Sequence, residues 1–265
     1  MNLMNKLEIN IDESFPHLSH APIIEAAIDI RVSGSELLEE NTFKSQIEPK
    51  LVNYRFWDSQ REIQFHLQHV VGPKESTPTP PVIQDLGWKG LRFRSEDGKQ
   101  IVQFNKNGFV LSRLDPYQSW EALYSEAIRL WEEYIAFIKP IEINRIGIRY
   151  INRFQLPLGE VRFEDYLNPS PEPPRNLDLP FMNFLHQDTL VVPDHPYAIN
   201  IVRTVQPPTD PNTVAVTLVL DIDAFTLSGF EFDNELLKRK LFEIRWLKNK
   251  AFFGSITDKA MKLFE

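Results

Sequence analysis

The sequence predicts an α+β fold in which antiparallel sheets are backed by long helices. Runs of alternating apolar and polar residues, typical of half-buried strands, follow one another through short turns. Asn107-Gly108, between two such runs, is a strong signal for a two-residue hairpin. Two longer stretches, 116–138 and 234–250, carry apolar residues at helical spacing. Strands joined by short turns pair antiparallel, so we expect the helices to lie against one face of the sheet.

The composition is that of an ordinary folded protein, because 42% of the 265 residues are hydrophobic and 25% are charged. The 29 Lys and Arg against 37 Asp and Glu give a net charge of −8, which disfavours nucleic acid as a partner. The lack of cysteine excludes disulfides, thiol nucleophiles and thiolate metal ligands. The start does not resemble a signal peptide, and no apolar run reaches the ~18 residues of a membrane span. We therefore expect a soluble, cytoplasmic protein with no membrane partner.

The first half of the chain begins with a polar, loosely held lead-in and continues with a series of predicted strands. A helix is expected at Glu36–Val52, where apolar side chains recur at roughly helical spacing. Gly72–Pro81 is rich in Pro, Ser and Thr, has no apolar anchor and is expected to be a loop. The predicted strands are Pro22–Val32, Tyr54–Trp57, Glu62–Val71, Gly90–Arg94, Gln100–Lys106 and Phe109–Arg113.

The best-defined helix is expected directly after these strands. Asp115 is suited to be its N-cap, with Pro116 at the first helical position and Gln118 completing a capping box. An apolar and aromatic face follows at steps of three to four residues and should be buried, and Pro140 ends the helix. This face comprises Trp120, Tyr124, Ala127, Trp131, Tyr134 and Ile138.

The second half follows a proline-rich passage, Asn168–Pro180, which marks the expected seam between two lobes. Asp233 is expected to cap a helix that runs to about Lys250 and ends before Gly254. Its inward residues are Leu237, Leu241, Ile244 and Leu247. The predicted strands are Phe181–Val192, Pro196–Gln206 and Thr213–Asp223, and a short last helix is expected at Ile256–Phe264.

The two halves resemble each other in outline. Each places an F-x-L-S segment, Phe109–Ser112 or Phe225–Ser228, between a series of strands and an amphipathic helix. This predicts an internal duplication with two similar β-meander-plus-helix halves, a first lobe at 15–158 and a second at 159–265, closely packed into one functional unit over 1–265. The identity is confined to that short segment, which chance alone can supply, so a fold without duplication is the alternative.

The segment Glu142–Pro157 is expected to be the central strand, because reading it with a period of two separates two unlike faces. One face carries Ile146, Ile148, Tyr150 and Asn152, and the other carries Arg145, Arg149 and Arg153. Successive arginines on such a strand lie ~13 Å apart at ~3.3 Å per residue. This arginine-bearing face is the feature of the sequence that points most directly to recognition.

The arginines form the first candidate site. Arg149 and Arg153, with Arg145 and with Arg92 and Arg94 from neighbouring strands, would make a cradle for a carboxylate or a phosphate. Polar side chains on both faces of a central strand also need partners, which favours a functional role for this strand. The alternative is that the arginines pair with acidic side chains on the helices or lie on a solvated sheet face.

Glu25 and Asp29 form a second candidate, since they lie four residues apart on one face of the first predicted strand. Such a pair of carboxylates suits acid–base chemistry or a divalent metal ion. The alternative is that both are ion-pair partners of the arginines, which would merge the two candidates into one structural network. The candidate ligand-binding residues are therefore Arg145, Arg149, Tyr150, Asn152, Arg153, Glu25 and Asp29.

Other chemistry has little support in the sequence. The H-x-x-H pairs His17/His20 and His66/His69 lack a third ligand, and residues three apart on a strand face opposite sides, so no metal site is expected. There is no G-x-S-x-G elbow, and the ten glycines form neither a G-x-G-x-x-G motif nor a Walker loop. We therefore expect no cofactor.

Two motifs stand out, an opening H-x-P-I-x-E element at His20–Glu25 and a central R-x-G-x-R-Y-I-N strand at Arg145–Asn152. In both, the chain resembles a sporadically distributed family of uncharacterised prokaryotic proteins of about this length. The resemblance extends over most of the chain. It implies one full-length domain and adds no catalytic residue.

We expect a non-catalytic recognition module that binds a protein partner, a second copy of the chain or an anionic small molecule at the arginine-bearing sheet face. The two long proline-rich passages favour a protein partner, since exposed loops are common contact surfaces. The alternative is an enzyme that acts on a phosphate-bearing substrate. In that case Arg145, Arg149 and Arg153 would hold the phosphate, and Glu25 or Asp29 would bind a metal ion or act as the base.

Overall fold

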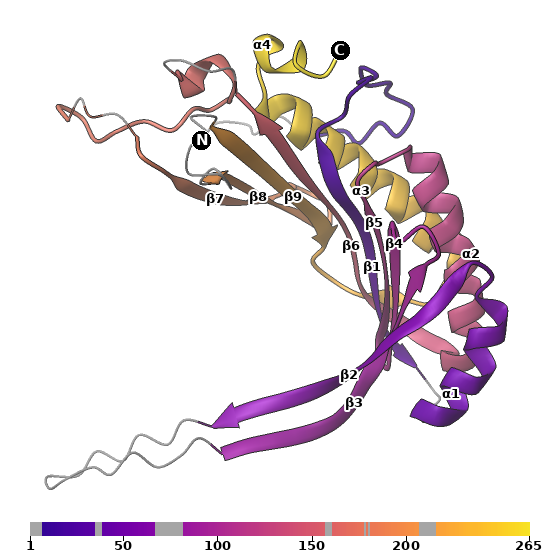
Figure 1. The fold of residues 1–265 in the computed structure, drawn as a ribbon. Helices are drawn as coiled ribbons and strands as arrows, with labels where there is room; N and C mark the ends of the chain where they lie inside the picture. The colour runs from indigo at the N-terminus through magenta and orange to yellow at the C-terminus, as the bar shows by residue number, and fades with distance from the viewer. Residues whose placement is uncertain are drawn as a thin grey trace, which may run out of the picture.

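The computed structural model describes residues 7–34, 39–66, 82–156, 161–177, 179, 181–206 and 216–265 of the chain. Within these ranges ten strands form one sheet, all neighbouring strands run antiparallel, and helices lie against one of the two sheet faces (Figure 1). The predicted α+β class with antiparallel pairing is confirmed.

The strands of the sheet, in chain order, are β1 (Ile23–Gly34), β2 (Tyr54–His66), β3 (Val82–Ser95), β4 (Gln100–Asn105), β5 (Gly108–Leu114), β6 (Pro140–Gln155), β7 (Leu185–Val191), β8 (Tyr197–Gln206), β9 (Thr217–Thr226) and β10 (Phe230–Glu231). The longest strands are β6, β3, β2 and β1, with 16, 14, 13 and 12 residues. The sheet order is β2-β3-β4-β5-β1-β6-β9-β8-β7, with β10 paired to β6. The pair β1 and β6 therefore lies at the middle of the sheet.

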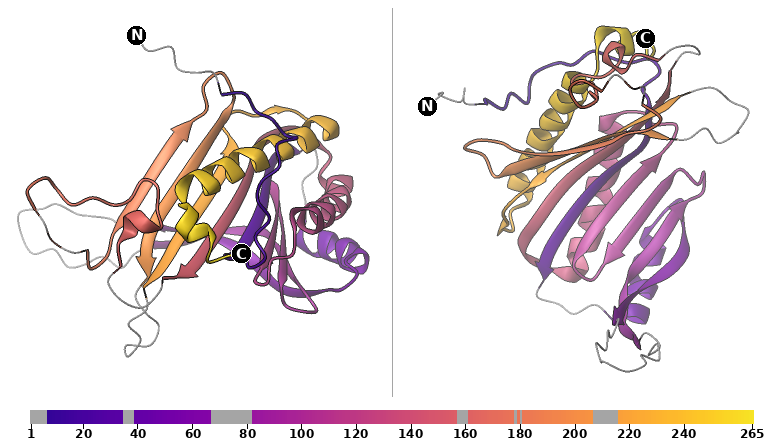
Figure 2. Two further views of the ribbon diagram at one scale, coloured as in Figure 1. Left: turned by 90° about the horizontal axis from the view of Figure 1, so that it is seen from above. Right: turned by 90° about the vertical axis from the view of Figure 1, so that its left-hand side faces the viewer.

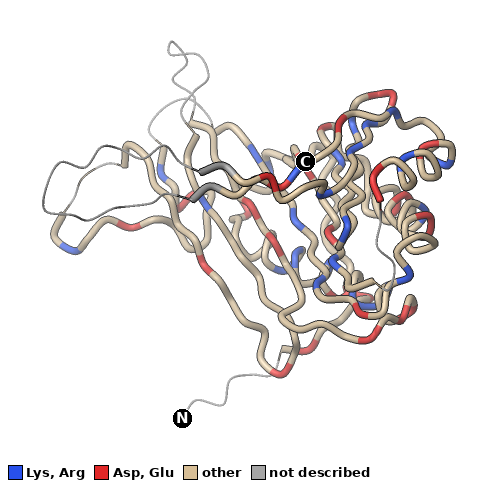
Figure 3. Tube along the Cα trace, turned by 90° about the horizontal axis from the view of Figure 1, so that it is seen from below, with Lys and Arg blue, Asp and Glu red and all other residues tan. Residues whose placement is uncertain are grey.

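Two long helices and several short ones complete the described part of the chain. The helices are α1 (Glu40–Ile47), η1 (Glu48–Lys50), α2 (Trp120–Ile138), η2 (Phe163–Asp165), α3 (Asn234–Ser255) and α4 (Asp258–Met261). Figure 2 shows α3, in yellow, crossing the sheet on the side away from its open face. Basic and acidic positions are distributed over strands and helices alike (Figure 3). Among the described helices, none combines the length and apolar character that a bilayer crossing requires.

The core lies between the sheet and the helices, and the alternation of the strands decides which side chains enter it. On β1, Ile28 and Ile30 are buried on the helix side, while Asp29 between them points to the open face. On α2 the predicted aromatic face is buried, except that Tyr124 is half-buried. Phe109 of β5 is completely buried under this helix, and such burial stabilises the fold by roughly 1.5–3 kcal/mol for each large apolar side chain.

The predicted start of α2 is wrong by four residues. Ser119 is the N-cap, and its hydroxyl accepts the backbone N–H of Ala122 at 3.1 Å. The carbonyl of Pro116 instead accepts two hydrogen bonds from the Arg113 guanidinium, at 3.2 and 3.1 Å. Asp115 and Pro116 therefore belong to the loop that leads into the helix, and the backbone N–H of Asp115, which the Gln118 side chain would accept in a capping box, donates instead to the carbonyl of Ile24 at 3.0 Å.

Several other boundaries also differ from the prediction. The first helix is limited to α1, since Glu39 caps it and Pro49 lies in the η1 turn that follows; residues 35–38 lie outside the described ranges. The two strands predicted within 54–71 are one strand, β2, as far as the described residues extend. The strand predicted at 90–94 is longer than expected and runs from Val82 to Ser95 as β3. The predicted loop Gly72–Pro81 lies wholly outside the described residues.

Corrections also apply to the second half. β7 begins at Leu185 rather than at residue 181, and β9 continues to Thr226. Asp233 caps α3 as predicted, but the helix passes through Gly254 and ends at Ser255, and the last helix is only the short α4. The inward-facing leucines and Ile244 of α3 are buried as predicted.

The predicted lobes join in one continuous sheet. In the first half, the strand series closes when β5 pairs with β1, and α2 follows; in the second, β9 pairs with β6, and α3 follows after β10. A repeated unit would have this connectivity. The internal duplication itself is not confirmed and stays a prediction.

Candidate functional site

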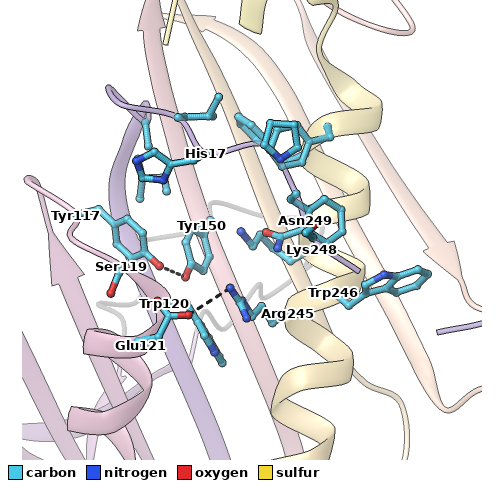
Figure 4. Close-up of a pocket in the computed structure, with 18 of the residues that line it drawn as sticks. His17, Tyr117, Ser119, Trp120, Glu121, Tyr150, Arg245, Trp246, Lys248 and Asn249 are labelled. Atoms are coloured by element: carbon cyan, nitrogen blue, oxygen red, sulfur yellow. Dashed lines mark hydrogen bonds and ion pairs between the residues drawn. The ribbon is translucent and has the colours of Figure 1, made fainter. Parts of the chain in front are cut away.

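A cavity of about 740 Å³ lies on the helix side of the sheet, between four parts of the chain that are distant in sequence (Figure 4). The N-terminal segment (residues 7–22) forms one wall through residues 11–19, 21 and 22, and residues 117–121 at the start of α2 form a second. Residues 242–253 of α3 form a third, and Tyr150 and Asn152 contribute from β6. Concave sites assembled from several elements are where ligands usually bind.

The N-terminal segment is held against α3, which corrects the expectation of a loose lead-in. The Glu13 carboxylate accepts a hydrogen bond from the indole N–H of Trp246 at 2.7 Å and pairs with the Lys250 ammonium at 2.9 Å. The Phe15 ring stacks on Phe253 with centroids 5.5 Å apart. Figure 2 shows this segment, in indigo, running beside α3. Apolar packing and the contacts of a half-buried carboxylate, neither of which is a local pattern, fix this side of the cavity.

Lys248 is the most unusual side chain in the cavity. It lies on the buried side of α3, is only 8% exposed, and places its Nζ 3.8 Å from the centroid of the Tyr150 ring. Among the described residues it has neither a hydrogen-bond acceptor nor an ion-pair partner. Burial, with a smaller contribution from the positive charge of Arg245, lowers the pKa of Lys248 to about 7. The amine is therefore partly neutral at physiological pH.

Two tyrosine hydroxyls meet beside this lysine. Tyr150 points to the helix side of β6, and its hydroxyl lies 2.8 Å from that of Tyr117, which precedes α2 (Figure 4). Burial raises the pKa of Tyr117 to about 12, although its hydrogen bond with Tyr150 lowers that pKa. Burial and the neighbouring Tyr117 also raise the pKa of Tyr150 well above its usual value. Both phenols therefore keep their protons at neutral pH and remain hydrogen-bond donors.

Arg245 supplies the second positive charge of the cavity, one helical turn before Lys248. Its guanidinium lies over the Trp120 ring at 5.3 Å and pairs with Glu121 at 3.6 Å. The Glu121 side chain is 72% exposed, so this ion pair lies at the rim and contributes little. The buried indole N–H of Trp120 has no acceptor among the described residues. The interior of the cavity is thus rich in hydrogen-bond donors.

The structure separates the residues that the sequence grouped as one ligand-binding set. Tyr150 and Asn152 face the cavity on the helix side, whereas the arginines, Glu25 and Asp29 lie on the open face of the sheet. The Asn152 side chain donates to the carbonyls of Leu220 at 3.0 Å and of Tyr150 at 3.4 Å. These bonds satisfy a buried amide within the sheet, so its position is explained by structure alone.

Arg145 bridges two aspartates on the strands at either side of β6. Its guanidinium lies 2.7 Å from the Asp29 carboxylate of β1 and 2.9 Å from that of Asp223 on β9, and it covers the Phe225 ring at 4.7 Å. Burial raises the pKa of Asp223, and the charges of Arg145 and Arg149 oppose that rise. The acidic partners come from neighbouring strands and not from the helices.

Arg149 continues the same network of ion pairs, whereas Glu25 and Arg153 form no ion pair within the described ranges. The Arg149 guanidinium forms a two-pronged ion pair with Asp221 of β9, with Nε at 2.9 Å from one carboxylate oxygen. This hydrogen bond raises the pKa of Arg149, and the charges of nearby carboxylates, Glu25 among them, add to the rise. Whether this face binds an anion or a protein stays a prediction.

Arg92 and Arg94 do not belong to this group, which corrects the expectation that they neighbour it. They lie on β3, and three strands separate β3 from β6. Arg92 pairs with Asp58 of β2, and the Arg94 Nε donates to the carbonyl of Gly98 at 3.1 Å. Strand order depends on long-range pairing, which the spacing of arginines in the sequence does not reveal.

The histidines of the two H-x-x-H pairs do not form a shared site among the described residues. His17 lines the cavity, whereas His20 Nδ1 lies 3.2 Å from the backbone oxygen of Glu265. His69 lies outside the described residues, as does the side chain of His66. No group of three or more His, Asp and Glu side chains that could hold a metal ion occurs within the described ranges.

Sequence reasoning missed the cavity residues Lys248, Arg245, Tyr117 and Glu13. One signal was present, since Lys248 falls four residues after Ile244 and seven after Leu241, on the apolar stripe of α3. A charged residue in such a stripe marks a buried site. The comparison of the chain with protein-family models and with curated proteins finds no match.

Proposed function

We propose that the protein binds a small anionic molecule in this cavity, with Lys248 and Arg245 recognising its charge. The observation that carries the proposal is Lys248, which is only 8% exposed and has no anionic partner among the described residues. An unpaired buried lysine is costly for folding, and groups with strongly shifted pKa values gather at functional sites. An anionic ligand would supply the missing partner.

The sign of the charge follows from the groups around the cavity. The carboxylate of Glu13 is occupied by Trp246 and Lys250, and that of Glu121 lies at the exposed rim. Lys248 has no such compensation near the Tyr117–Tyr150 pair, and Arg245 has only the exposed rim pair with Glu121 at 3.6 Å. A carboxylate or phosphate would accept hydrogen bonds from these donors and would reduce the repulsion between the two cations.

Thermal unfolding of the full chain tests the proposal with acetate, lactate, succinate and inorganic phosphate, each compared with neutral acetamide. A ligand at 100 times its Kd adds about 2.7 kcal/mol of stability, which raises Tm measurably. We expect at least one of these anions, and not acetamide, to raise Tm of the wild type. We expect no such rise in Lys248→Met or Arg245→Gln.

Arg153→Met is the matched control, because Arg153 lies on the opposite face of the sheet and should leave the response unchanged. The proposal is wrong if none of the four anions raises Tm. It is also wrong if an anion raises Tm equally in the wild type and in both cavity variants, because binding would then occur elsewhere.

The open face of the sheet remains the place where we propose that a protein partner or a second copy of the chain would bind. Arg145 and Arg149 are already paired with aspartates there. An enzyme that held a phosphate with these arginines would have to exchange those aspartates for the phosphate, whereas Lys248 needs no such exchange. The lack of cysteine is compatible with the cytoplasmic location that we propose.

A further inference from the structure

We propose that Lys248 forms an imine with the carbonyl carbon of a small 2-oxo acid held in the cavity. This inference rests on the proposed function, since the acid group of the ligand is the anion that the cavity recognises. It adds a covalent step to that binding and names the chemical class of the ligand.

The environment of Lys248 is that of a nucleophilic amine. A lysine becomes nucleophilic when it is desolvated or placed next to another cation, and both conditions hold here, through burial and through Arg245. Because burial lowers the pKa of Lys248 to about 7, a substantial fraction of this amine is neutral at neutral pH, whereas an ordinary lysine is almost entirely charged there. The nitrogen lone pair is then free to react, because no described residue occupies it.

The reaction needs only groups that are present in the cavity. The amine nitrogen bonds to the carbonyl carbon, the C=O π electrons move to oxygen, and proton transfer gives a neutral carbinolamine. The hydroxyl then takes up one proton and leaves as water, and the nitrogen releases its N–H proton in exchange, which leaves a C=N bond. The net change is amine plus carbonyl to imine plus water, without an oxidant or a reductant. The paired hydroxyls of Tyr117 and Tyr150 are suited to donate to the carbinolamine oxygen.

Arg245 makes a 2-oxo acid a better fit than a simple aldehyde. Residues three apart on a helix are neighbours on its surface, so the guanidinium of Arg245 and the amine of Lys248 border the same part of the cavity. A carboxylate adjacent to a carbonyl would place its charge against the guanidinium while its carbonyl carbon faces the amine. Arg245 would thus be a positioning residue, since it holds the ligand without taking part in bond formation.

Lys240 provides a control on the same helix. Burial also lowers its pKa, but its Nζ lies 3.3 Å from the Tyr197 hydroxyl and 5.1 Å from the centroid of that ring. It is not among the residues that line the cavity. A reagent that modified any lysine of lowered pKa would label Lys240 as well, whereas imine formation in the cavity would select Lys248.

Reductive trapping tests the inference. The full chain is incubated with pyruvate and sodium cyanoborohydride at neutral pH, which converts an imine to a stable secondary amine by adding hydride to carbon and a proton to nitrogen. Intact mass and peptide mapping should show one reduced adduct, on Lys248. Lys248→Met should abolish it and Lys240→Met should retain it. Lactate, which has the acid group but a hydroxyl in place of the ketone, should give no adduct.

Three results would overturn the inference, and they separate it from the proposed function. If lactate raises Tm but pyruvate gives no adduct, Lys248 binds an anion without reacting, and only the imine is wrong. If no anion raises Tm and no adduct forms, both proposals fall. If adducts are spread over many lysines and are as abundant in Lys248→Met, the trapping reflects surface amines.

In Arg245→Gln the adduct should form at least several-fold more slowly, with saturation at higher pyruvate concentration.

Discussion

The amine of Lys248 lies 3.8 Å from the centre of the Tyr150 ring, so an ionisable group of α3 meets one of β6 at the cavity. The ring face attracts a cation and offsets part of the burial that lowers the lysine pKa. Tyr150 in turn keeps its proton because it is buried and bonded to Tyr117. The balance between a neutral and a charged amine is therefore set by these three residues and Arg245.

The first prediction concerns the pH dependence of stability. Because burial lowers the pKa of Lys248 to about 7, the unfolded chain holds a proton between about pH 7 and 10 that the folded chain lacks. Wild-type stability should therefore rise with pH in that window by up to about 1.4 kcal/mol per pH unit from this group. The loss of stability caused by burying a charged Lys248 is complete below about pH 7, and it disappears above the pKa of an ordinary lysine.

Lys248→Met isolates this contribution, since methionine has a similar length and no charge. Urea unfolding of both proteins between about pH 6 and 9 should show the variant as the more stable, by about 1–4 kcal/mol near neutrality. The difference should shrink as the pH rises. A difference that stays constant over this range would show that Lys248 titrates as an ordinary surface lysine.

The second prediction is an asymmetry between the two tyrosines. Tyr117→Phe leaves the buried hydroxyl of Tyr150 without its described partner, and should cost about 1–3 kcal/mol of unfolding free energy. Tyr150→Phe leaves the hydroxyl of the half-buried Tyr117 able to bond water, and should cost only about 0.5–1.5 kcal/mol. Chemical denaturation measures both. Equal costs would mean that water already reaches Tyr150.

The third prediction concerns Arg145, which separates Asp29 from Asp223. Arg145→Met would leave two carboxylates, on the strands at either side of β6, without their common cation, at side-chain exposures of 23% each. We expect a loss of about 1–3 kcal/mol, less than for fully buried pairs. Arg153→Met on the same face should change stability by no more than about 0.5 kcal/mol.

Acid should reduce the effect of Arg145→Met. Protonation of the carboxylates below about pH 4 removes their repulsion, so the stability gap to the wild type should narrow there. Because burial raises the pKa of Asp223, this carboxylate should gain its proton at a higher pH than an ordinary aspartate does. A gap that persists at low pH would show that Arg145 stabilises the sheet by packing on Phe225 and not by charge.

Local patterns in the sequence were sufficient for the α+β class, the antiparallel pairing and much of the core. The alternation in β6 correctly placed Arg149 and Tyr150 on opposite faces, and the spacing in α3 correctly gave its buried leucines. These predictions depend on the periods of strands and helices, which are properties of the chain alone. They do not depend on which strands become neighbours.

The cavity was beyond such patterns because its parts meet only through tertiary packing. Glu13 reaches Trp246 across more than two hundred residues, and Tyr117 faces Tyr150 from a loop. The grouping of Arg92 with Arg149 failed for the same reason, since sheet order is a long-range property. Lys248 alone left a local signal, as a charge on an apolar stripe.

The fourth prediction tests the corrected start of α2. Ser119→Ala removes the cap that accepts the backbone N–H of Ala122, and should cost about 1 kcal/mol in urea unfolding. Asp115→Ala, at the position that the sequence suggested for the cap, should cost no more than a few tenths of a kcal/mol. A larger loss of stability in Asp115→Ala than in Ser119→Ala would show that the helix begins at Pro116, as the sequence predicted.

The last prediction concerns the wall that the N-terminal segment adds to the cavity. Glu13 joins this segment to α3 through Trp246 and Lys250, and these two hydrogen bonds hold the pKa of Glu13 below its ordinary value. Glu13→Ala should therefore free the segment without unfolding the sheet. Hydrogen exchange of residues 7–22 should become several-fold faster, with the amides of β6 unchanged.

Glu8→Ala is the matched control, because Glu8 is exposed and should leave exchange unaltered. If the segment is a true wall of the ligand site, Glu13→Ala should also weaken the Tm response to whichever anion stabilises the wild type, since one side of the cavity would open to water. Faster exchange with an unchanged response would place the bound anion entirely among α2, α3 and β6. An unchanged exchange rate would show that the stacking of Phe15 on Phe253 holds the segment without Glu13.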